Sequence, residues 1–146
     1  MKLREVVESD LEVFFHHQAD PETKAMSGHP GREREAYFEH MRVNVLPQGH
    51  DEGIIRAIEV DGQLVGNVLA WFEDEKWLLG YVLGRQWWGR GIASQAVAEL
   101  LKLIPHARPV FAEVSPGNVG SRRVLEKNGF ELVSEGAETF EFKLAG

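Results

Sequence analysis

The stretch with the clearest capacity for chemistry is a glycine-containing loop at residues 84–91. An expected strand from Trp77 to Leu83 leads into it, and an expected helix from Gly91 to Leu103 leads out. Gly89 and Gly91 allow the backbone to turn so that several amide N–H groups face one concavity, to which the helix adds its dipole. Such a loop favours binding of a phosphate or pyrophosphate. Because glycine pairs also occur in ordinary strand-to-helix turns, the loop alone leaves both interpretations open.

Two common phosphate-binding loops differ from this one. The loop that binds ATP or GTP needs Gly-Lys-Ser/Thr after its glycines, whereas this chain has Gly91-Ile92-Ala93. The dinucleotide fingerprint G-x-G-x-x-G is nearly complete, with Ser94 in place of the third glycine and Glu113 at the distance of a ribose-binding acid. Four residues separate Gly84 from Gly89, however, whereas a dinucleotide turn follows its strand almost directly. A dinucleotide-binding protein therefore stays as a distant alternative.

Nucleophile and metal chemistry is constrained by which residues are missing. The chain has no Cys, which excludes disulfides, thiolate metal sites and a cysteine acyl-enzyme. His16 and His17 are adjacent, and no His pair has the i, i+4 spacing of a helical metal site, so we expect no metal. Glu73-Asp74-Glu75 supplies carboxylates, although a charged turn is usually a solvated turn.

The remaining patterns predict the elements that position this loop. Ser9-Asp10-Leu11-Glu12 is typical of a capping box and predicts the start of the first helix. Asp61-Gly62 predicts a hairpin between two strands, while Asp20-Pro21 and the run from Gly28 to Gly31 break the chain. The expected strands are Leu3–Val7, Ile54–Val60, Gln63–Phe72, Trp77–Leu83, Val110–Val114, Phe130–Val133 and Thr139–Leu144, and the expected helices begin near Ser9, Arg32, Gly91 and Asn118.

This order predicts an α/β protein with a mixed sheet and helices on both faces. The 146 residues suit one domain, 1–146, and 43% apolar with 27% charged residues excludes disorder. No apolar run is long enough to cross a bilayer, and the N-terminus lacks the apolar segment of a signal peptide, so we expect a cytoplasmic protein without a membrane partner. A net charge of −7 disfavours nucleic acid as a partner.

Two segments resemble the GNAT superfamily of N-acetyltransferases. Gln86-x-x-Gly89-x-Gly91-x-Ala93 is similar to the Q/R-x-x-G-x-G/A motif, which in that family cradles the pyrophosphate of acetyl-CoA. The stretch from Glu113 to Phe130 is similar to the family's N-x-x-S/A…K-x-G-F segment, and Tyr81 and Trp88 resemble the branch that includes ribosomal-protein alanine acetyltransferases. The resemblance implies a GNAT-like fold, with six to seven strands in a mostly antiparallel mixed sheet flanked by about four helices.

The same resemblance implies direct transfer of an acetyl group from acetyl-CoA, as co-substrate, to a primary amine in a ternary complex. The strand at Val82-Leu83 would pair with the pantetheine arm and offer a backbone N–H to the thioester carbonyl, a contribution of order 3 kcal/mol. The cofactor-binding residues that the resemblance implies are Val82, Leu83, Gln86, Trp88, Gly89, Arg90, Gly91, Ile92, Ala93, Ser94 and Asn118.

Three residues are candidates for the proton transfers. Glu113 stands five residues before Asn118, where some family members keep their catalytic base, and its alternative role is a solvent-facing strand residue. The family Tyr that protonates the leaving thiolate falls at Leu125, which has no acidic proton. Ser121 and Tyr81 are the candidate substitutes, and Ser121 can equally serve helix packing.

Two classes of function therefore remain. One is an N-acetyltransferase acting on a small-molecule or peptide amine; the other is a non-catalytic module on the same fold that senses acyl-CoA. The unassigned general acid keeps the second class open. We expect a monomer or homodimer, with the segment from Asp20 to Gly31 and the turn from Ser134 to Glu138 bordering the acceptor site.

Overall fold

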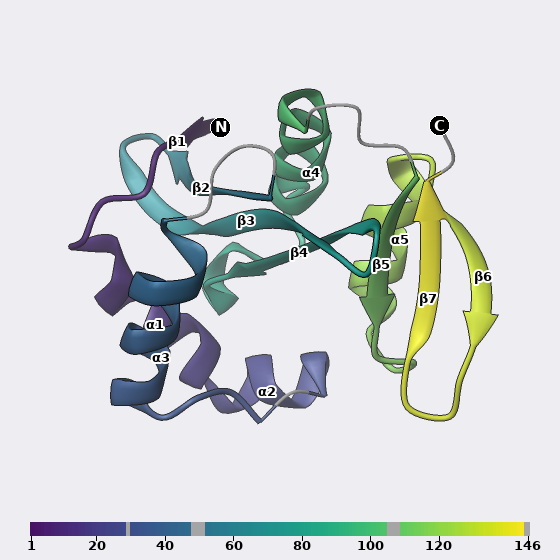
Figure 1. Cartoon of the computed structure of the whole chain (residues 1–146), viewed down its shortest axis with the longest axis horizontal. Helices are drawn as coiled ribbons and strands as arrows, with labels where there is room; N and C mark the ends of the chain where they lie inside the picture. The colour runs from purple at the N-terminus through teal and green to yellow at the C-terminus, as the bar shows by residue number, and fades with distance from the viewer. Residues whose placement is uncertain (29, 48–51, 105–108, 145–146) are drawn as a thin grey trace.

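The computed structural model describes residues 1–28, 30–47, 52–104 and 109–144, which form a seven-stranded sheet with helices on both faces (Figure 1). The strand order is β1-β2-β3-β4-β5-β7-β6. Only β4 and β5 run parallel within the described ranges, and the other neighbours are antiparallel. The predicted α/β class and mostly antiparallel mixed sheet are thus confirmed. The strands are β1 (Lys2–Arg4), β2 (Gly53–Val60), β3 (Gln63–Glu73), β4 (Lys76–Leu83), β5 (Val110–Val114), β6 (Glu131–Glu135) and β7 (Phe140–Leu144).

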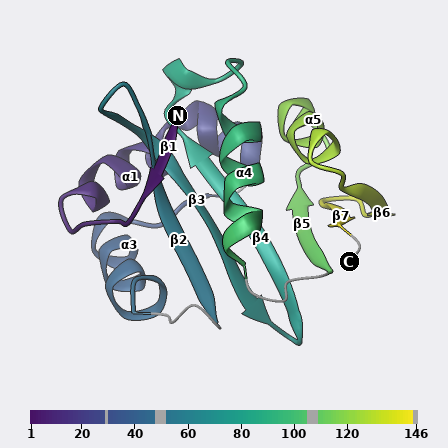
Figure 2. The ribbon, with the colours of Figure 1, turned by 90° about the horizontal axis from the view of Figure 1, so that it is seen from above.

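The helices divide between the two faces of the sheet, with α1 and α3 on one face and α4 on the other (Figure 2). One core cluster joins the sheet to α4 and α5 through residues such as Val97 and Leu125, and a second joins it to α1 and α3 through Phe14 and Tyr37. The helices are α1 (Asp10–Ala19), α2 (Pro21–Ser27), α3 (Arg34–His40), the π-helical turn η1 (Met41–Val45), the 3-10 turn η2 (Arg85–Trp87), α4 (Ile92–Leu103) and α5 (Val119–Lys127). Within those ranges no helix is long and apolar enough to cross a membrane.

A gap between β4 and β5 is the feature of the sheet that matters for function. The two strands pair only at Trp77–Val110 and Leu78–Phe111, near their N-terminal ends. Figure 2 shows them diverging towards their C-terminal ends. The C-terminal half of β4 therefore has β3 on one side and an opening on the other.

Two predictions about the N-terminal region are wrong. Ser9 has helical backbone angles and makes no capping hydrogen bond; instead the Asp10 carboxylate accepts the Val7 N–H at 2.8 Å and pairs with Arg4. The capping-box pattern reflects only neighbouring residues in the sequence, whereas the partner of Asp10, Arg4, comes from β1. The predicted breaks at Asp20-Pro21 and Gly28 are present, but the segment between them, expected without a helix, forms α2. The Asp20 carboxylate caps this helix and Pro21 occupies its first position.

The predicted second helix is divided. The helix expected to begin near Arg32 is α3, which ends at His40, and the chain continues as the π-helical turn η1. Tyr37 of α3 and Met41 of η1 are both buried. The Asp61-Gly62 hairpin between β2 and β3 is confirmed, with positive φ at both turn residues as a type I′ turn requires.

Candidate active site

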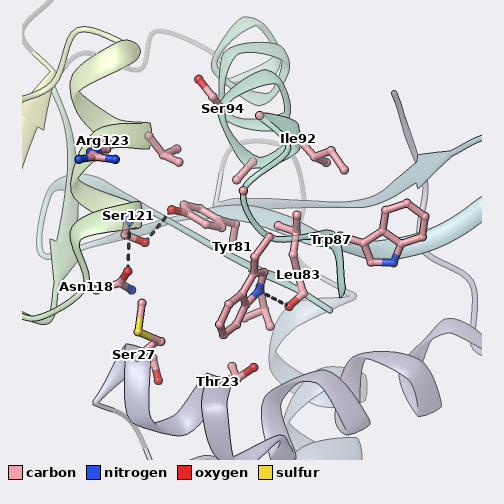
Figure 3. Close-up of a pocket in the computed structure, with 18 of the residues that line it drawn as sticks. Thr23, Ser27, Tyr81, Leu83, Trp87, Ile92, Ser94, Asn118, Ser121 and Arg123 are labelled. Carbon is pink, nitrogen blue, oxygen red and sulfur yellow. Dashed lines mark hydrogen bonds between the residues drawn. The ribbon is translucent and has the colours of Figure 1, made fainter. Parts of the chain in front are cut away.

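The gap between β4 and β5 leads into a cavity of about 400 Å³. Figure 3 shows α4 above the partly buried side chain of Tyr81, α5 beside it and α2 below it. The cavity therefore passes from one face of the sheet to the other at the place where the strands separate. Its lining comprises Thr23, Met26, Ser27, Tyr81, Val82, Leu83, Trp87, Trp88, Gly89, Gly91, Ile92, Ala93, Ser94, Asn118, Gly120, Ser121, Arg123, Val124 and Lys127.

The end of the cavity at α4 has the properties of an anion site. Gly89 and Gly91 have φ of 76° and 78°, and a Cβ at either position would meet no atom within 4 Å, so both glycines border open space. The first α4 amide with a partner in the preceding turn is that of Gln95, which donates to the Gly91 carbonyl. The amides before it are the orphan donors of a helix N-terminus, and the helix dipole favours an anion beside them.

The charged residues of the cavity lining also favour an anion. The chain as a whole carries −7. The charged residues that line the cavity are nevertheless two cations, Arg123 and Lys127, both from α5. Asn128 Nδ2 donates to the Ser94 carbonyl at 3.2 Å and to the Val124 carbonyl at 3.0 Å, and so ties the first turn of α4 to α5. These contacts fix a cationic and amide-rich pocket of the kind that a pyrophosphate needs.

The free edge of β4 presents alternate backbone groups to the gap. The Gly84 N–H donates to the Val65 carbonyl at 2.9 Å, which sets the phase of the β3–β4 ladder. In an antiparallel ladder the next residue directed at β3 is two positions back, so Val82 bonds towards β3. The backbone groups of Tyr81 and Leu83 therefore point into the gap. Of the pair Val82-Leu83, expected to offer a backbone N–H to a ligand, Leu83 is the residue with the required direction, because Val82 faces β3.

Trp88 forms a hydrogen bond with one of these backbone groups at the β4 edge. Its indole Nε1–H donates to the Leu83 carbonyl at 3.1 Å, which holds the indole at the strand end. The side chain is 36% exposed and borders the cavity. Trp88 thus closes the strand end and leaves the Leu83 N–H directed at the cavity.

Tyr81 and Ser121 form the polar centre of the cavity. The Tyr81 hydroxyl lies 2.6 Å from Ser121 Oγ, and the Ser121 amide donates to Asn118 Oδ1 at 3.1 Å. Burial raises the pKa of the Tyr81 hydroxyl, and the hydrogen bond with Ser121 offsets part of this rise. Tyr81 consequently keeps its proton at neutral pH and can act as a hydrogen-bond donor.

The structure brings most of the predicted site residues together. Tyr81, Ser121, Asn118 and the predicted loop residues from Val82 onward line the cavity, with the exception of Gln86 and Arg90. The Gln86 side chain lies against Gly84 instead, and the Arg90 guanidinium lies over the Trp87 ring at 5.1 Å. Both side chains are exposed, and neither lines the cavity.

Glu113 lies outside the cavity lining. Its neighbours Ala112 and Val114 are buried in the core shared with α4 and α5, so strand alternation directs Glu113 to the opposite face, which bears α1 and α3. The Glu113 side chain is exposed, and its cross-strand neighbour on β7 is Glu141. The runner-up carboxylates of Glu73-Asp74-Glu75 form an exposed turn.

Sequence reasoning missed part of the lining. Thr23, Met26 and Ser27 come from α2, whose residues were expected only as a segment bordering the acceptor site. The Asp-Pro pair at its start is a cap followed by a first-turn proline, a signal that could have identified the helix. Leu125 is 1% exposed, as an apolar core residue should be. Among the described residues no cluster of three or more His, Asp or Glu could hold a metal ion.

A family model described as an acetyltransferase (GNAT) domain matches residues 1–131. The chain belongs to the GNAT acetyltransferase family. As a member of this family it is an acetyl-CoA-dependent acyltransferase. No curated protein sequence is a significant match to the chain.

Solved structures share the GNAT fold at low sequence identity. The aminoglycoside acetyltransferase AAC(6')-Ib in complex with coenzyme A has a TM-score of 0.77 and 16% identity, over 99% of this chain and 94% of that one. A domain from Methanocaldococcus jannaschii has a TM-score of 0.82 and 16% identity, over 99% and 97% of the two chains. An acetyltransferase from Agrobacterium tumefaciens has a TM-score of 0.79 and 21% identity, over 99% and 90%. At these identities the likeness shows the fold alone.

Proposed function

We propose that this GNAT protein is an N-acetyltransferase in which a primary amine attacks acetyl-CoA directly in a ternary complex. The observation that carries the proposal is the cavity that crosses the sheet through the β4–β5 gap. Its α4 end suits the pyrophosphate, and its α2 end opens on the other face. Two substrates can thus approach from opposite faces and meet beside Tyr81, with no covalent relay through a protein thiol.

The Leu83 N–H acts on the thioester carbonyl in this proposal. Acetyl-CoA supplies the activated acetyl group as a thioester. The Leu83 N–H, directed into the gap, donates to the carbonyl oxygen as negative charge develops there. The amine nitrogen bonds to the carbonyl carbon, the C–S bond breaks, and the products are an amide and CoA.

Two protons must move during this reaction. The attacking amine loses one through water to Glu113, whose carboxylate lies on the face of the sheet that bears α1 and α3. The departing sulfur takes the other from the Tyr81 hydroxyl, which Ser121 holds from α5, and water returns a proton to the tyrosinate. This pair takes the part that a Tyr at position 125 would play in the family pattern.

An amine panel monitored by thiol release tests the proposal. The panel consists of glycinamide, a tripeptide with a free N-terminus, spermidine and kanamycin, and the absence of Cys removes any background thiol from the protein. We expect at least one amine to release CoA together with an equal amount of acetylated product, measured by mass spectrometry. A protein that acetyl-CoA stabilises thermally but that releases no CoA with any amine would instead be a sensing module.

A further inference from the structure

Helix α2 is fixed at both ends to the parts of the chain that border the cavity. At its start, the Asp20 carboxylate accepts the Glu22 N–H at 2.8 Å. The same carboxylate pairs with Nε of Arg85, the first residue of η2, at 3.4 Å. At its end, Gly28 lies against the loop between β5 and α5, since a Cβ there would stand 3.3 Å from Ser115 Oγ. Helix α2 therefore has a fixed position across the mouth of the gap.

Thr23 is the residue of α2 with an unused polar group. Its Oγ1 is shielded from solvent and has no hydrogen-bond partner among the described residues. A helical Thr commonly bonds its hydroxyl to a carbonyl of the preceding turn, and a buried hydroxyl without a partner is costly. Because Thr has two accessible χ1 rotamers in a helix, a rotation can exchange Oγ1 and Cγ2 on the cavity wall. A ligand group that bonds this hydroxyl would recover the missing interaction.

The position of Thr23 identifies the substrate that would do so. Figure 3 shows Thr23 and Ser27 below Tyr81, and Ser94 of α4 above it. The phosphates belong at the α4 end, so the α2 end faces the acceptor. The α2 residues that line the cavity are Thr23, Met26 and Ser27, none of which is charged. This wall suits a neutral amine held by a hydrogen bond rather than an ammonium held by a carboxylate.

We propose that Thr23 is a specificity-determining residue for the acceptor, and this rests on the function proposed above. Its Oγ1 accepts a hydrogen bond from an N–H of the attacking amine. That contact turns the nitrogen lone pair towards the thioester carbon, while the second N–H of a primary amine stays available to the water that leads to Glu113. The cofactor makes no use of this hydroxyl.

Three variants test the proposal. Thr23→Val removes the hydroxyl and keeps the shape, Thr23→Ser keeps the hydroxyl, and Glu22→Gln changes an exposed side chain of the same helix that lies outside the cavity lining. With the best amine of the panel, kcat/KM for the amine should fall roughly 5–10-fold in Thr23→Val, the factor expected for one hydrogen bond. It should stay within about twofold of wild type in the other two variants, and the KM for acetyl-CoA should not change.

Two results would overturn it. One is an unchanged kcat/KM for the amine in Thr23→Val. The other is an equal rise in the KM for acetyl-CoA, which would assign the hydroxyl to the pantetheine arm. The melting temperature of Thr23→Val should match or exceed that of wild type, because the variant loses only an unpartnered buried hydroxyl.

A binding measurement separates this proposal from the proposed function. Calorimetry gives the Kd of each panel amine for protein saturated with CoA, where no reaction occurs. If wild type binds an amine but never releases CoA, the transferase function fails, and the Kd ratio of Thr23→Val to wild type still decides the role of Thr23. If wild type binds no panel amine in the presence of CoA, the Thr23 proposal is wrong.

Discussion

The Tyr81 hydroxyl lies 2.6 Å from Ser121 Oγ and so links β4 to α5 across the gap in the sheet. Ser121 stands one helical turn before Leu125 on α5, and residues four apart lie on the same face of a helix. A hydroxyl from β4 thus lies one helical turn from position 125, where the resemblance to the family places a Tyr.

Removing the Tyr81 hydroxyl should slow the chemical step. In Tyr81→Phe we expect kcat to fall about 10²-fold with little change in the KM for acetyl-CoA, since the lost group acts on the departing sulfur. Ser121→Ala should cost less, and the double variant should be no slower than Tyr81→Phe, because residues that act as a unit are not additive. Steady-state kinetics at saturating amine measures all three. Multiplicative losses in the double variant would contradict the pairing.

Gly89→Val should abolish the thermal shift that acetyl-CoA produces. The φ of 76° is unfavourable for a branched residue, and the added side chain would enter the open space that the phosphates need. Gly62→Val is the matched control, because Gly62 also has a positive φ, of 78°, and open space around it, but lies in the β2–β3 hairpin. Both variants should lose stability, and only Gly62→Val should retain the shift. A Gly89→Val protein that acetyl-CoA still stabilises would place the pyrophosphate elsewhere.

Leu125→Ala should affect stability rather than chemistry. The side chain is 1% exposed within the core between α5 and the sheet. Its truncation should lower the free energy of unfolding by roughly 2–5 kcal/mol, as measured by urea denaturation. Leu132→Ala, at a position that is 37% exposed, should change it far less. A stable Leu125→Ala variant that binds acetyl-CoA but has no turnover would show that position 125 serves the reaction.

Features of this fold that depend on neighbouring residues could be predicted from the sequence, whereas features that depend on contacts between elements could not. The strand-loop-helix order around Gly89 and the Asp61-Gly62 hairpin depend on neighbours in the sequence, and both are present. Which β4 backbone groups face the gap depends on the pairing of β4 with β3. The sequence alone therefore could not decide whether the N–H of Val82 or that of Leu83 faces it. The partner of Asp10 likewise comes from another element, and this overrode the capping pattern at Ser9.

His17 should make the folded state less stable in mild acid. Burial lowers the pKa of its imidazole, which lies against Gly84, and its Nδ1 has no partner among the described residues. Above pH of about 6.5, the ordinary histidine pKa, neither state binds the proton. As the pH falls below that value the unfolded chain binds it first, so the free energy of unfolding decreases until the folded pKa is reached.

The experiment is urea denaturation at pH 7.5 and about 5.5. The loss of stability between the two should be smaller in His17→Gln than in wild type. His16→Gln should reduce the loss less than His17→Gln does, because burial contributes more than the charge of His16 to the lowered pKa of His17. Burial also lowers the pKa of His40, so some pH dependence should remain in His17→Gln. Equal losses in wild type and His17→Gln would rule His17 out as the source.

Glu113→Gln tests the proposed base. The substitution keeps size and hydrogen-bonding capacity and removes the proton acceptor, so acetyl-CoA binding should be unchanged while turnover falls about 10²–10⁴-fold. Glu141→Gln is the matched control, because Glu141 is the cross-strand neighbour of Glu113 in the β5–β7 ladder. The loss in Glu113→Gln should shrink as the pH rises towards the pKa of the amine, since more of the nucleophile then arrives neutral and needs no base. A loss that is constant with pH would mean that Glu113 positions the acceptor. Wild-type turnover near neutral pH would remove Glu113 from the mechanism and direct attention to Glu73-Asp74-Glu75.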